Sequence, residues 1–337
     1  MISPLTRMLP QGARHGTLFL ANLPDENEDI SQYLGNKFLE KTMLMTKELP
    51  VRFTSDFDGA DAVLVPIDLK NFVRNKSYLN YLRNLSLEKT LLIFNVGDFA
   101  LKKLSIPNVI YFRTSLHPGE DPTNKIIIPY PIDRIECQYS FKDKAKLVSF
   151  VGFTPRLISS RILKAFKDSP LHPFKGNGAI IRKIMIQRLS KSHLSKEVIL
   201  RNEYGGKRFT DPQEAKIRRK EFVSSILQSR YIFCPRGDSN QSQRFFEVLS
   251  AGRVPVVIDT SMCFPEVENV NYSEFIISLK LSKSINTLDR QILEFDRRYS
   301  DEKFDELSDR IRGFFDENLD YPIFFKKLFR DFLTKDN

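Results

Sequence analysis

Short apolar runs alternate with segments of helical periodicity along the chain. In the first half, the runs have the length of buried strands and end at turn residues; they cover residues 16–22, 51–54, 61–67, 91–95, 108–112 and 125–130. Segments with helical spacing of apolar residues lie around 29–46 and 71–86. Alternation of this kind predicts an α/β protein with parallel sheets.

The alternation restarts after a polar stretch, PIDRIECQYSFKDKAK, which is predicted to be a linker. Beyond it, strands are expected at 147–152, 230–235 and 254–258, and helices at 157–167, 214–229 and 244–251. The C-terminal segment has the pattern of amphipathic helices, as in FDELSDRIRGFF and FFKKLFRDFL.

This pattern predicts two Rossmann-like, doubly wound domains over residues 1–135 and 146–300, followed by helices at 301–337 that pack back across the domains. Two domains of ordinary size suit a chain of 337 residues. In open sheets of this type, ligands bind beyond the carboxyl ends of the strands. We therefore expect a cleft between the domains, with the loops after the strands facing it.

Composition excludes several classes of protein. No window approaches the roughly 20 apolar residues of a membrane span, and the N-terminus lacks a continuous apolar run of signal-peptide length. The three cysteines show no metal-ligand spacing, which favours a reducing compartment without disulfides. A soluble, cytoplasmic protein is the expectation.

The formal net charge is +10, so an anionic partner has to be considered. The basic residues are spread out, and the densest cluster, within residues 216–220, lies on a predicted helix as a solvated face. No nucleic-acid-binding module is visible, so no nucleic acid is expected as a partner. A basic surface also suits peripheral contact with an anionic membrane or a charged glycan.

The segment FCPRGDSNQSQRFFEVLSAGRVPVVIDT (233–260) carries the chemistry. Arg236 and Gly237 follow directly on a strand, where an Arg offers a planar fork to phosphate oxygens and a Gly lets the backbone approach a ligand. The loop then places Arg244 in the first turn of the next helix. Free N–H groups and the helix dipole make such a helix N-terminus suitable for a diphosphate.

Two further residues extend this site. Ser242 is a candidate helix cap or phosphate donor. Glu247 lies one turn into the helix, where a carboxylate can accept hydrogen bonds from both vicinal hydroxyls of a ribose. Each feature has an ordinary structural explanation by itself, but together at this spacing they indicate a nucleotide-diphosphate site.

The segment resembles the signature of the exostosin-type glycosyltransferases. The matching residues are Phe233, Pro235, Arg236, Gly237, Asp238, Ser242, Arg244, Glu247, Gly252, Pro255 and Val256, and the match continues into CFPEVENVNYSEFIISL (263–279). Two weaker matches lie upstream, in FDGADAVLVPI (57–67) and in SFVGFTPRLISSRILKAF (149–166).

The resemblance implies a GT-B fold in which the N-terminal domain takes the acceptor and the C-terminal domain holds a nucleotide-sugar donor. It also implies inverting transfer of a sugar, with a UDP-sugar as the expected donor, to a glycan or polysaccharide hydroxyl. No cofactor and no metal is expected, because arginines and helix dipoles stabilise the departing diphosphate in such enzymes.

The resemblance also assigns roles to individual residues. Arg236 and Arg244 would contact the diphosphate, Ser242 would donate to it, and Glu247 would hold the ribose. From the facing turn, Arg156 or Arg161 would add positive charge, and Gly152 would let that turn approach the donor.

The chain departs from the family pattern where a His–Asp pair often ends a strand of the N-terminal domain. Here the sequence is FNVGDF (94–99), so Asn95 stands in place of the histidine. An inverting transfer needs a base for the acceptor hydroxyl. Asp98 is the first candidate for the catalytic base and Asp68, after the 61–67 strand, is the second.

Two alternatives remain open at this stage. A GDP-fucose-type fucosyltransferase shares the architecture, but such enzymes carry an adjacent Glu-Lys pair in the corresponding helix. This chain has Arg244 and Glu247 three residues apart, which favours the exostosin type. A non-catalytic polyanion or nucleic-acid binder on the same fold would show strongly salt-dependent binding and no hydrolysis of nucleotide sugars.

Overall fold

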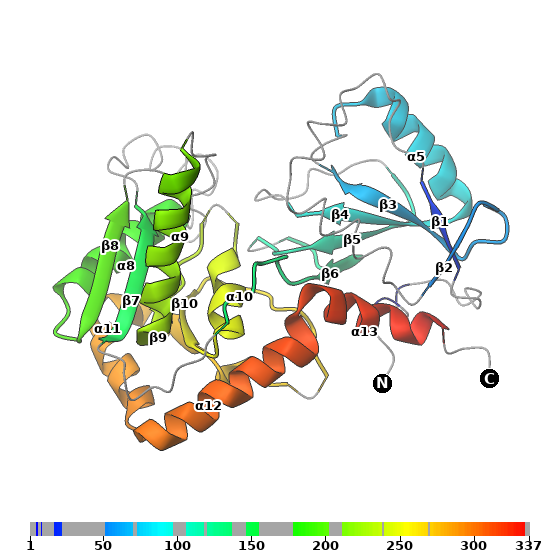
Figure 1. Cartoon of the computed structure of the whole chain (residues 1–337). Coiled ribbons are helices and arrows are strands. Elements are labelled where there is room, and N and C mark those ends of the chain that lie inside the picture. Colours follow the sequence, from blue (N-terminus) through cyan, green and yellow to red (C-terminus); the bar gives the residue numbers. More distant parts are fainter. Residues whose placement is uncertain are drawn as a thin grey trace. The chain divides into compact units, whose positions relative to one another are not determined.

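The computed structural model describes two compact units, each built around a parallel sheet (Figure 1). Unit 1 comprises residues 1–131, 263–268 and 317–337, and unit 2 comprises residues 132–262 and 269–316. The residues described are 5, 8, 17–21, 51–69, 73–96, 106–117, 120–136, 146–154, 178–201, 211–237, 239–268 and 270–333. Among them, no helix combines the length and the apolar character that crossing a membrane requires.

The sheet of unit 1 has six parallel strands in the order β2-β1-β3-β4-β5-β6. Their bounds are β1 Thr17–Leu20, β2 Arg52–Thr54, β3 Ala62–Asp68, β4 Thr90–Asn95, β5 Val109–Arg113 and β6 Lys125–Ile127. These strands lie where the apolar runs predict them. The helix predicted around 71–86 is α5, Lys76–Glu88, which begins after Asn75 because that side chain accepts a hydrogen bond from the amide of Tyr78.

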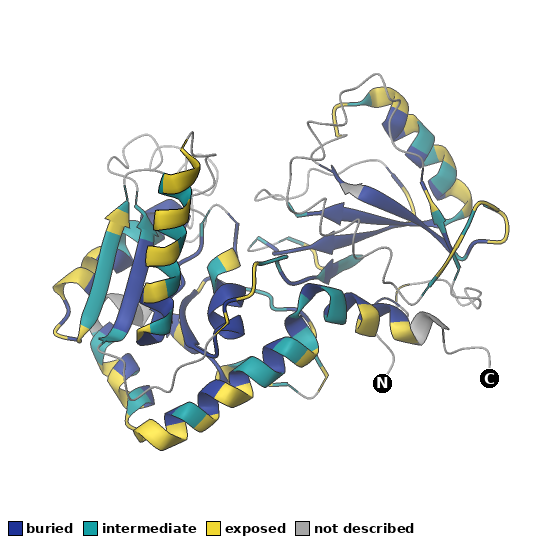
Figure 2. Cartoon of the chain, viewed as in Figure 1, coloured by how far each residue is buried: buried dark blue, intermediate teal, exposed yellow. Residues whose placement is uncertain are grey.

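Both faces of this sheet are covered, which explains why its strands are apolar without alternation (Figure 2). One face carries Val63, Ile93 and Tyr111 against α5. The opposite face carries Leu64, Phe94 and Phe112.

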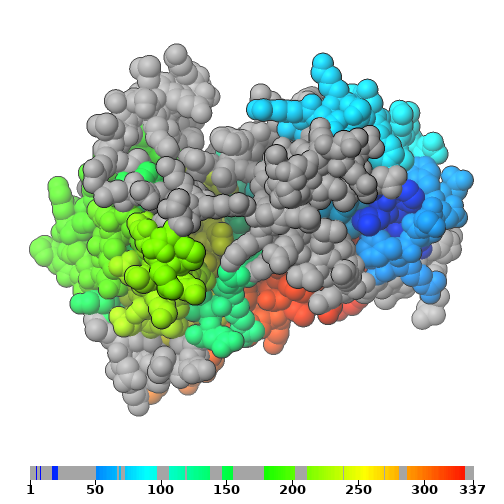
Figure 3. Space-filling model, turned by 45° about the horizontal axis from the view of Figure 1, so that its top comes forward, coloured from blue at the N-terminus to red at the C-terminus, as the bar shows by residue number. Residues whose placement is uncertain are grey.

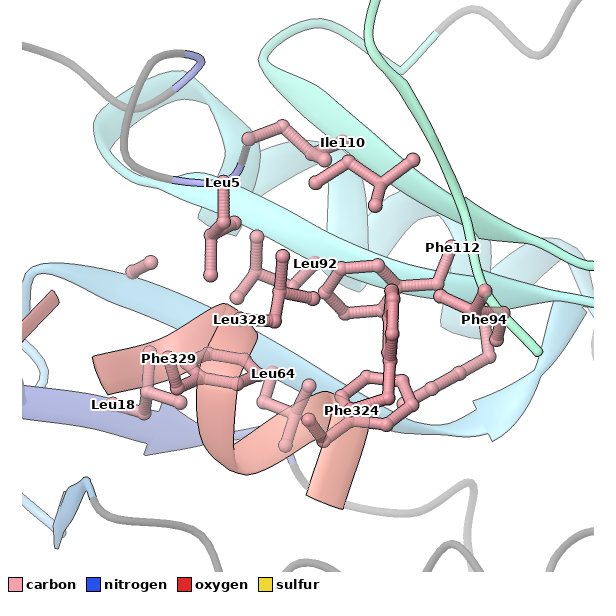
Figure 4. Close-up of a cluster of buried hydrophobic side chains, with 14 of the residues drawn as sticks. Leu5, Leu18, Leu64, Leu92, Phe94, Ile110, Phe112, Phe324, Leu328 and Phe329 are labelled. Atoms are coloured by element: carbon pink, nitrogen blue, oxygen red, sulfur yellow. The ribbon is translucent and has the colours of Figure 1, made fainter. Parts of the chain in front are cut away.

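The helix α13, Tyr321–Leu333, packs against this second face of the sheet. Figure 4 shows Phe324, Leu328 and Phe329 of α13 among the strand side chains. Phe325 of the same helix lies 5.6 Å from the Phe112 ring, centroid to centroid, in an edge-to-face contact. The core of unit 1 therefore joins its first strands to a helix that follows all of unit 2 in the sequence.

The sheet of unit 2 has five parallel strands in the order β11-β10-β9-β7-β8. They are β7 Lys146–Phe153, β8 Lys196–Arg201, β9 Ser229–Phe233, β10 Val254–Asp259 and β11 Ile277–Lys280. The helices are α8 Gly178–Lys191, α9 Pro212–Leu227, α10 Gln243–Ser250, α11 Leu281–Asp296 and α12 Asp301–Phe314; a π-helical turn, Phe315–Leu319, leads to α13.

The predicted α/β class with parallel sheets is thus confirmed. Three elements of unit 2, namely α8, β8 and β11, have no counterpart in the prediction. The predicted helices at 29–46 and 157–167 lie outside the described residues. Helix α10 ends as expected, since Gly252 adopts a φ of +66° directly after the cap residue Ala251.

Candidate functional site

The carboxyl edge of the unit 2 sheet carries the predicted anion-binding loop. β9 leads into residues 234–242, and α10 begins after Ser242, whose backbone is extended with φ −123° and ψ 132°. The Ser242 side chain makes no capping hydrogen bond to the helix. Because the Ser242 hydroxyl does not cap the helix, it can donate to a ligand together with the first backbone amides of α10. Such a helix N-terminus suits an anion.

Arg236 is buried, with 1% of its surface exposed. Its backbone carbonyl accepts hydrogen bonds from Arg182 of α8, at 3.3 Å from Nε and 3.1 Å from Nη2. α8 approaches this loop so closely that a Cβ on Gly178 would lie 1.7 Å from the carbonyl oxygen of Gly237. The first residue of α8 must therefore be a glycine for the loop to take this position.

Arg244 is held inside the edge of the sheet. Its Nη2 donates to the Val151 carbonyl at 2.5 Å and its Nη1 to the Phe233 carbonyl at 3.4 Å. The guanidinium also lies over two rings, 4.6 Å from the Phe150 centroid and 5.3 Å from that of Phe222. These contacts tie α10 to β7 and β9, so Arg244 has a structural function in addition to any contact with a ligand.

The surroundings of Arg244 lower the pKa of its guanidinium from the ordinary value, chiefly through burial, while Cys234 and Glu247 act in the opposite direction. The Arg244 guanidinium also lies directly beside Gly152. A Cβ at residue 152 would lie 2.6 Å from Arg244 Nη2. Gly152 therefore makes room for Arg244, which the sequence did not predict.

Glu247 projects from α10 as a largely buried carboxylate. Its Oε1 accepts a hydrogen bond from Arg219 Nη1 of α9 at 2.6 Å. The predicted ribose-binding carboxylate is thus paired with an arginine that the sequence analysis placed on a solvated face.

Three more polar residues at this edge escaped the sequence analysis. Arg182 also donates to the Phe153 carbonyl at 3.4 Å, and Arg201, the last residue of β8, pairs with Glu221. Gln241 is 2% exposed, and its carboxamide has no hydrogen-bond partner among the described residues. The apolar positions Ile181, Met185 and Leu189 have helical spacing and were the available signal for α8.

In unit 1, the carboxyl edge of the sheet holds Asp68 at the end of β3 and Arg113 at the end of β5. Asp68 is 1% exposed, so an acceptor hydroxyl can reach its carboxylate only after a rearrangement. Arg113 Nη2 lies 3.5 Å from Glu120 Oε2. Burial lowers the pKa of Arg113, and the carboxylates of Glu120 and Asp68 counteract this effect.

The other predicted site residues, Asp98, Arg156 and Arg161, lie outside the described residues. Within the described part of the chain, no group of three or more His, Cys, Asp or Glu side chains is placed to hold a metal ion. The arrangement at the unit 2 edge is therefore dominated by guanidinium groups, a helix N-terminus and one paired carboxylate.

These features are those of a class of α/β protein whose sheet edge has the groups suited to an anionic ligand. The family comparison is consistent with this class. Residues 126–290 match the model of the Exostosin GT47 domain, which confirms the resemblance predicted from residues 233–260. This part of the chain, just under half of its length, is therefore similar to glycosyltransferase domains of the exostosin type.

The chain is also similar to solved structures of low sequence identity. Anabaena HepE, in complex with UDP and glucose, is 10% identical with a TM-score of 0.43, and 95% of this chain covers 99% of it. The lipopolysaccharide outer core galactosyltransferase WaaB is 9% identical with a TM-score of 0.43 over the same shares of the two chains. TarM is 11% identical with a TM-score of 0.37, and 75% of this chain spans 57% of TarM's length. No curated protein matches the sequence.

Proposed function

We propose that the protein transfers a sugar, with inversion, from a UDP-sugar to a hydroxyl group of a glycan or polysaccharide. The observation that carries the proposal is that Arg236, the first turn of α10 and Glu247 belong to one strand–loop–helix unit, which follows β9 at the carboxyl edge of the unit 2 sheet. The UDP-sugar is the donor that the exostosin resemblance implies.

Each part of this edge has a chemical use in the proposed reaction. The diphosphate lies against the first amides of α10, with Ser242 as a hydroxyl donor. Arg236 and its neighbour Arg182 add positive charge where the departing nucleotide gains negative charge. Glu247 accepts hydrogen bonds from the ribose.

The proposed reaction proceeds without a metal ion, because arginines and a helix N-terminus supply the positive potential that a metal would otherwise provide. A carboxylate takes the proton from the acceptor hydroxyl. Asp98 remains our first candidate for this base and Asp68 the second. The acceptor is a glycan, and the basic surface of the protein suits an anionic one.

The test is a panel of UDP-sugars and GDP-fucose incubated with the purified protein in the presence and absence of EDTA, with release of free nucleotide as the measurement. We expect slow release of UDP from one UDP-sugar, unchanged by EDTA. We also expect Glu247→Gln to bind UDP about tenfold more weakly, because a neutral amide accepts hydrogen bonds less strongly than a carboxylate.

A matched control is Glu294→Gln, which removes an exposed carboxylate of α11 that pairs with Arg290 of the same helix. Release of GDP from GDP-fucose in place of UDP would contradict the donor assignment. Binding of UDP that is equally tight in wild type and Glu247→Gln would remove Glu247 from the site.

A further inference from the structure

Helices α9 and α10 are joined by two matched side-chain contacts at the donor edge. α9 contributes Arg219 and Phe222, and α10 contributes Arg244 and Glu247, so both pairs have the i, i+3 spacing that places residues on one helix face. Arg219 is bonded to Glu247 at 2.6 Å, while Phe222 lies 5.3 Å from the Arg244 guanidinium. The two contacts fix the register of the two helices.

Arg219 is further fixed by contacts outside α10. Its Nη2 donates to the backbone carbonyl of Asp133 at 3.2 Å, and its guanidinium lies 5.4 Å from the Phe222 centroid. The two nitrogens of one planar fork thus bind two different parts of unit 2. A lysine cannot reproduce this geometry, because its ammonium is a single point charge on a flexible stem.

The carboxylate that pairs with Arg219, that of Glu247, is restricted in its orientation because it is largely buried. The Glu247 side chain is 8% exposed, whereas that of Arg219 is 38% exposed, so the pair lies at the boundary between the interior and solvent. The hydrogen bond from Arg219 Nη1 is accepted by Oε1 of Glu247. A charge-assisted bond to one oxygen sets the plane of the carboxylate and thereby the direction of the other oxygen, Oε2.

We propose that Arg219 is a positioning residue for nucleotide recognition: it holds the Glu247 carboxylate in the orientation in which this group accepts hydrogen bonds from the ribose hydroxyls. The inference rests on the proposed function, since it assumes a nucleoside diphosphate at this edge. It adds a residue on a neighbouring helix to the recognition of the ribose.

The experiment compares the dissociation constants of UDP and 2′,3′-dideoxy-UDP by calorimetry, because only UDP carries the two hydroxyls. In wild type we expect UDP to bind at least about tenfold more tightly, because its ribose hydroxyls donate hydrogen bonds to a charged carboxylate. In Arg219→Ala, this preference should fall to about twofold or less, with the affinity for 2′,3′-dideoxy-UDP nearly unchanged. Arg219→Lys should lie between the two.

The matched control is Lys220→Ala, which removes one positive charge from an exposed position of the same helix. Figure 3 shows side chains of α9, in yellow-green, on the surface of the molecule in this view. Lys220→Ala should keep the wild-type preference. An equal loss of preference in this control would attribute the effect to net charge and overturn the proposal.

The outcomes separate the two proposals. If Glu247→Gln loses the preference for UDP and Arg219→Ala and Arg219→Lys both keep it, the positioning role is wrong while the ribose site stands. If Arg219→Ala weakens both nucleotides by the same factor, Arg219 serves only the packing of α9 on α10. If wild type itself shows no preference, the assignment of the ribose to Glu247 fails, and the positioning role fails with it.

Discussion

Replacing Arg244 by alanine should destabilise unit 2 and not only weaken ligand binding. The guanidinium donates to two strand carbonyls and lies over two aromatic rings. Two hydrogen bonds from a charged donor contribute about 1.5–3 kcal/mol each, and each cation–π contact about 0.5–1 kcal/mol. The cost of burying the guanidinium, which lowers its pKa, offsets part of this sum. We therefore expect a net loss of about 2–4 kcal/mol in the free energy of unfolding.

The assay is urea denaturation followed by far-UV circular dichroism. With a slope of about 2 kcal/mol per M urea, the expected loss lowers the transition midpoint by about 1–2 M. Arg290→Ala is the control, because Arg290 is exposed and pairs with Glu294 at 3.6 Å within one helix. Such a pair contributes at most about 0.5 kcal/mol.

A midpoint of Arg244→Ala that matches the Arg290→Ala midpoint would refute the structural function of Arg244. The sequence alone suggests that Arg244→Ala loses nucleotide affinity with an intact fold. The structure adds that the loss of affinity and the loss of stability should appear together, since the same side chain anchors the helix whose N-terminus faces the ligand.

Three further predictions concern other residues. Gly178→Ala should lower the urea midpoint strongly, because the new Cβ would lie 1.7 Å from the Gly237 carbonyl oxygen. The control Gly313→Ala should leave the midpoint unchanged or raise it, because a Cβ there would meet no atom of another element within 4 Å. Asp98→Asn should lower kcat far more than donor affinity; full turnover in this variant would exclude Asp98 as the base. Cys234 should resist iodoacetamide in the native protein at pH 8, because burial raises the pKa of its thiol to about 12 and keeps the thiol protonated at that pH. Peptide mass spectrometry measures the labelling, and rapid labelling would contradict the burial of Cys234.

Much of the fold follows from the sequence because the strands of both sheets are short apolar runs between turn residues. The pattern fails for β8, whose residues Lys196–Arg201 lie at a sheet edge and are only partly buried, so no apolar run marks them. In α8 the helical spacing of Ile181, Met185 and Leu189 is present but obscured, because Ala179 and Ile180 are also apolar and buried and so widen the apolar face of the helix.

The sequence predicts where the candidate site lies along the chain but not which residues contact it. Arg236, Ser242 and Glu247 stand at one sheet edge because the motif places them on one strand–loop–helix unit. The partners of these residues come from distant segments, as with Arg219 beside Glu247 and Arg182 beside Arg236. The spacing of residues in the sequence does not predict pairs between distant segments. A paired arginine therefore cannot be distinguished from a solvated arginine by sequence alone.

The packing of α13 on the unit 1 sheet has a consequence for biosynthesis. A ribosome makes the strands of unit 1 well before Phe325 and Phe329, which cover Phe94 and Phe112 in the finished core. Until then, Phe94 and Phe112 lack the α13 side chains that cover them, and the whole of unit 2 is translated in the meantime. A fragment cut before residue 321 should therefore be prone to aggregate, although it contains β1 to β6 of that sheet.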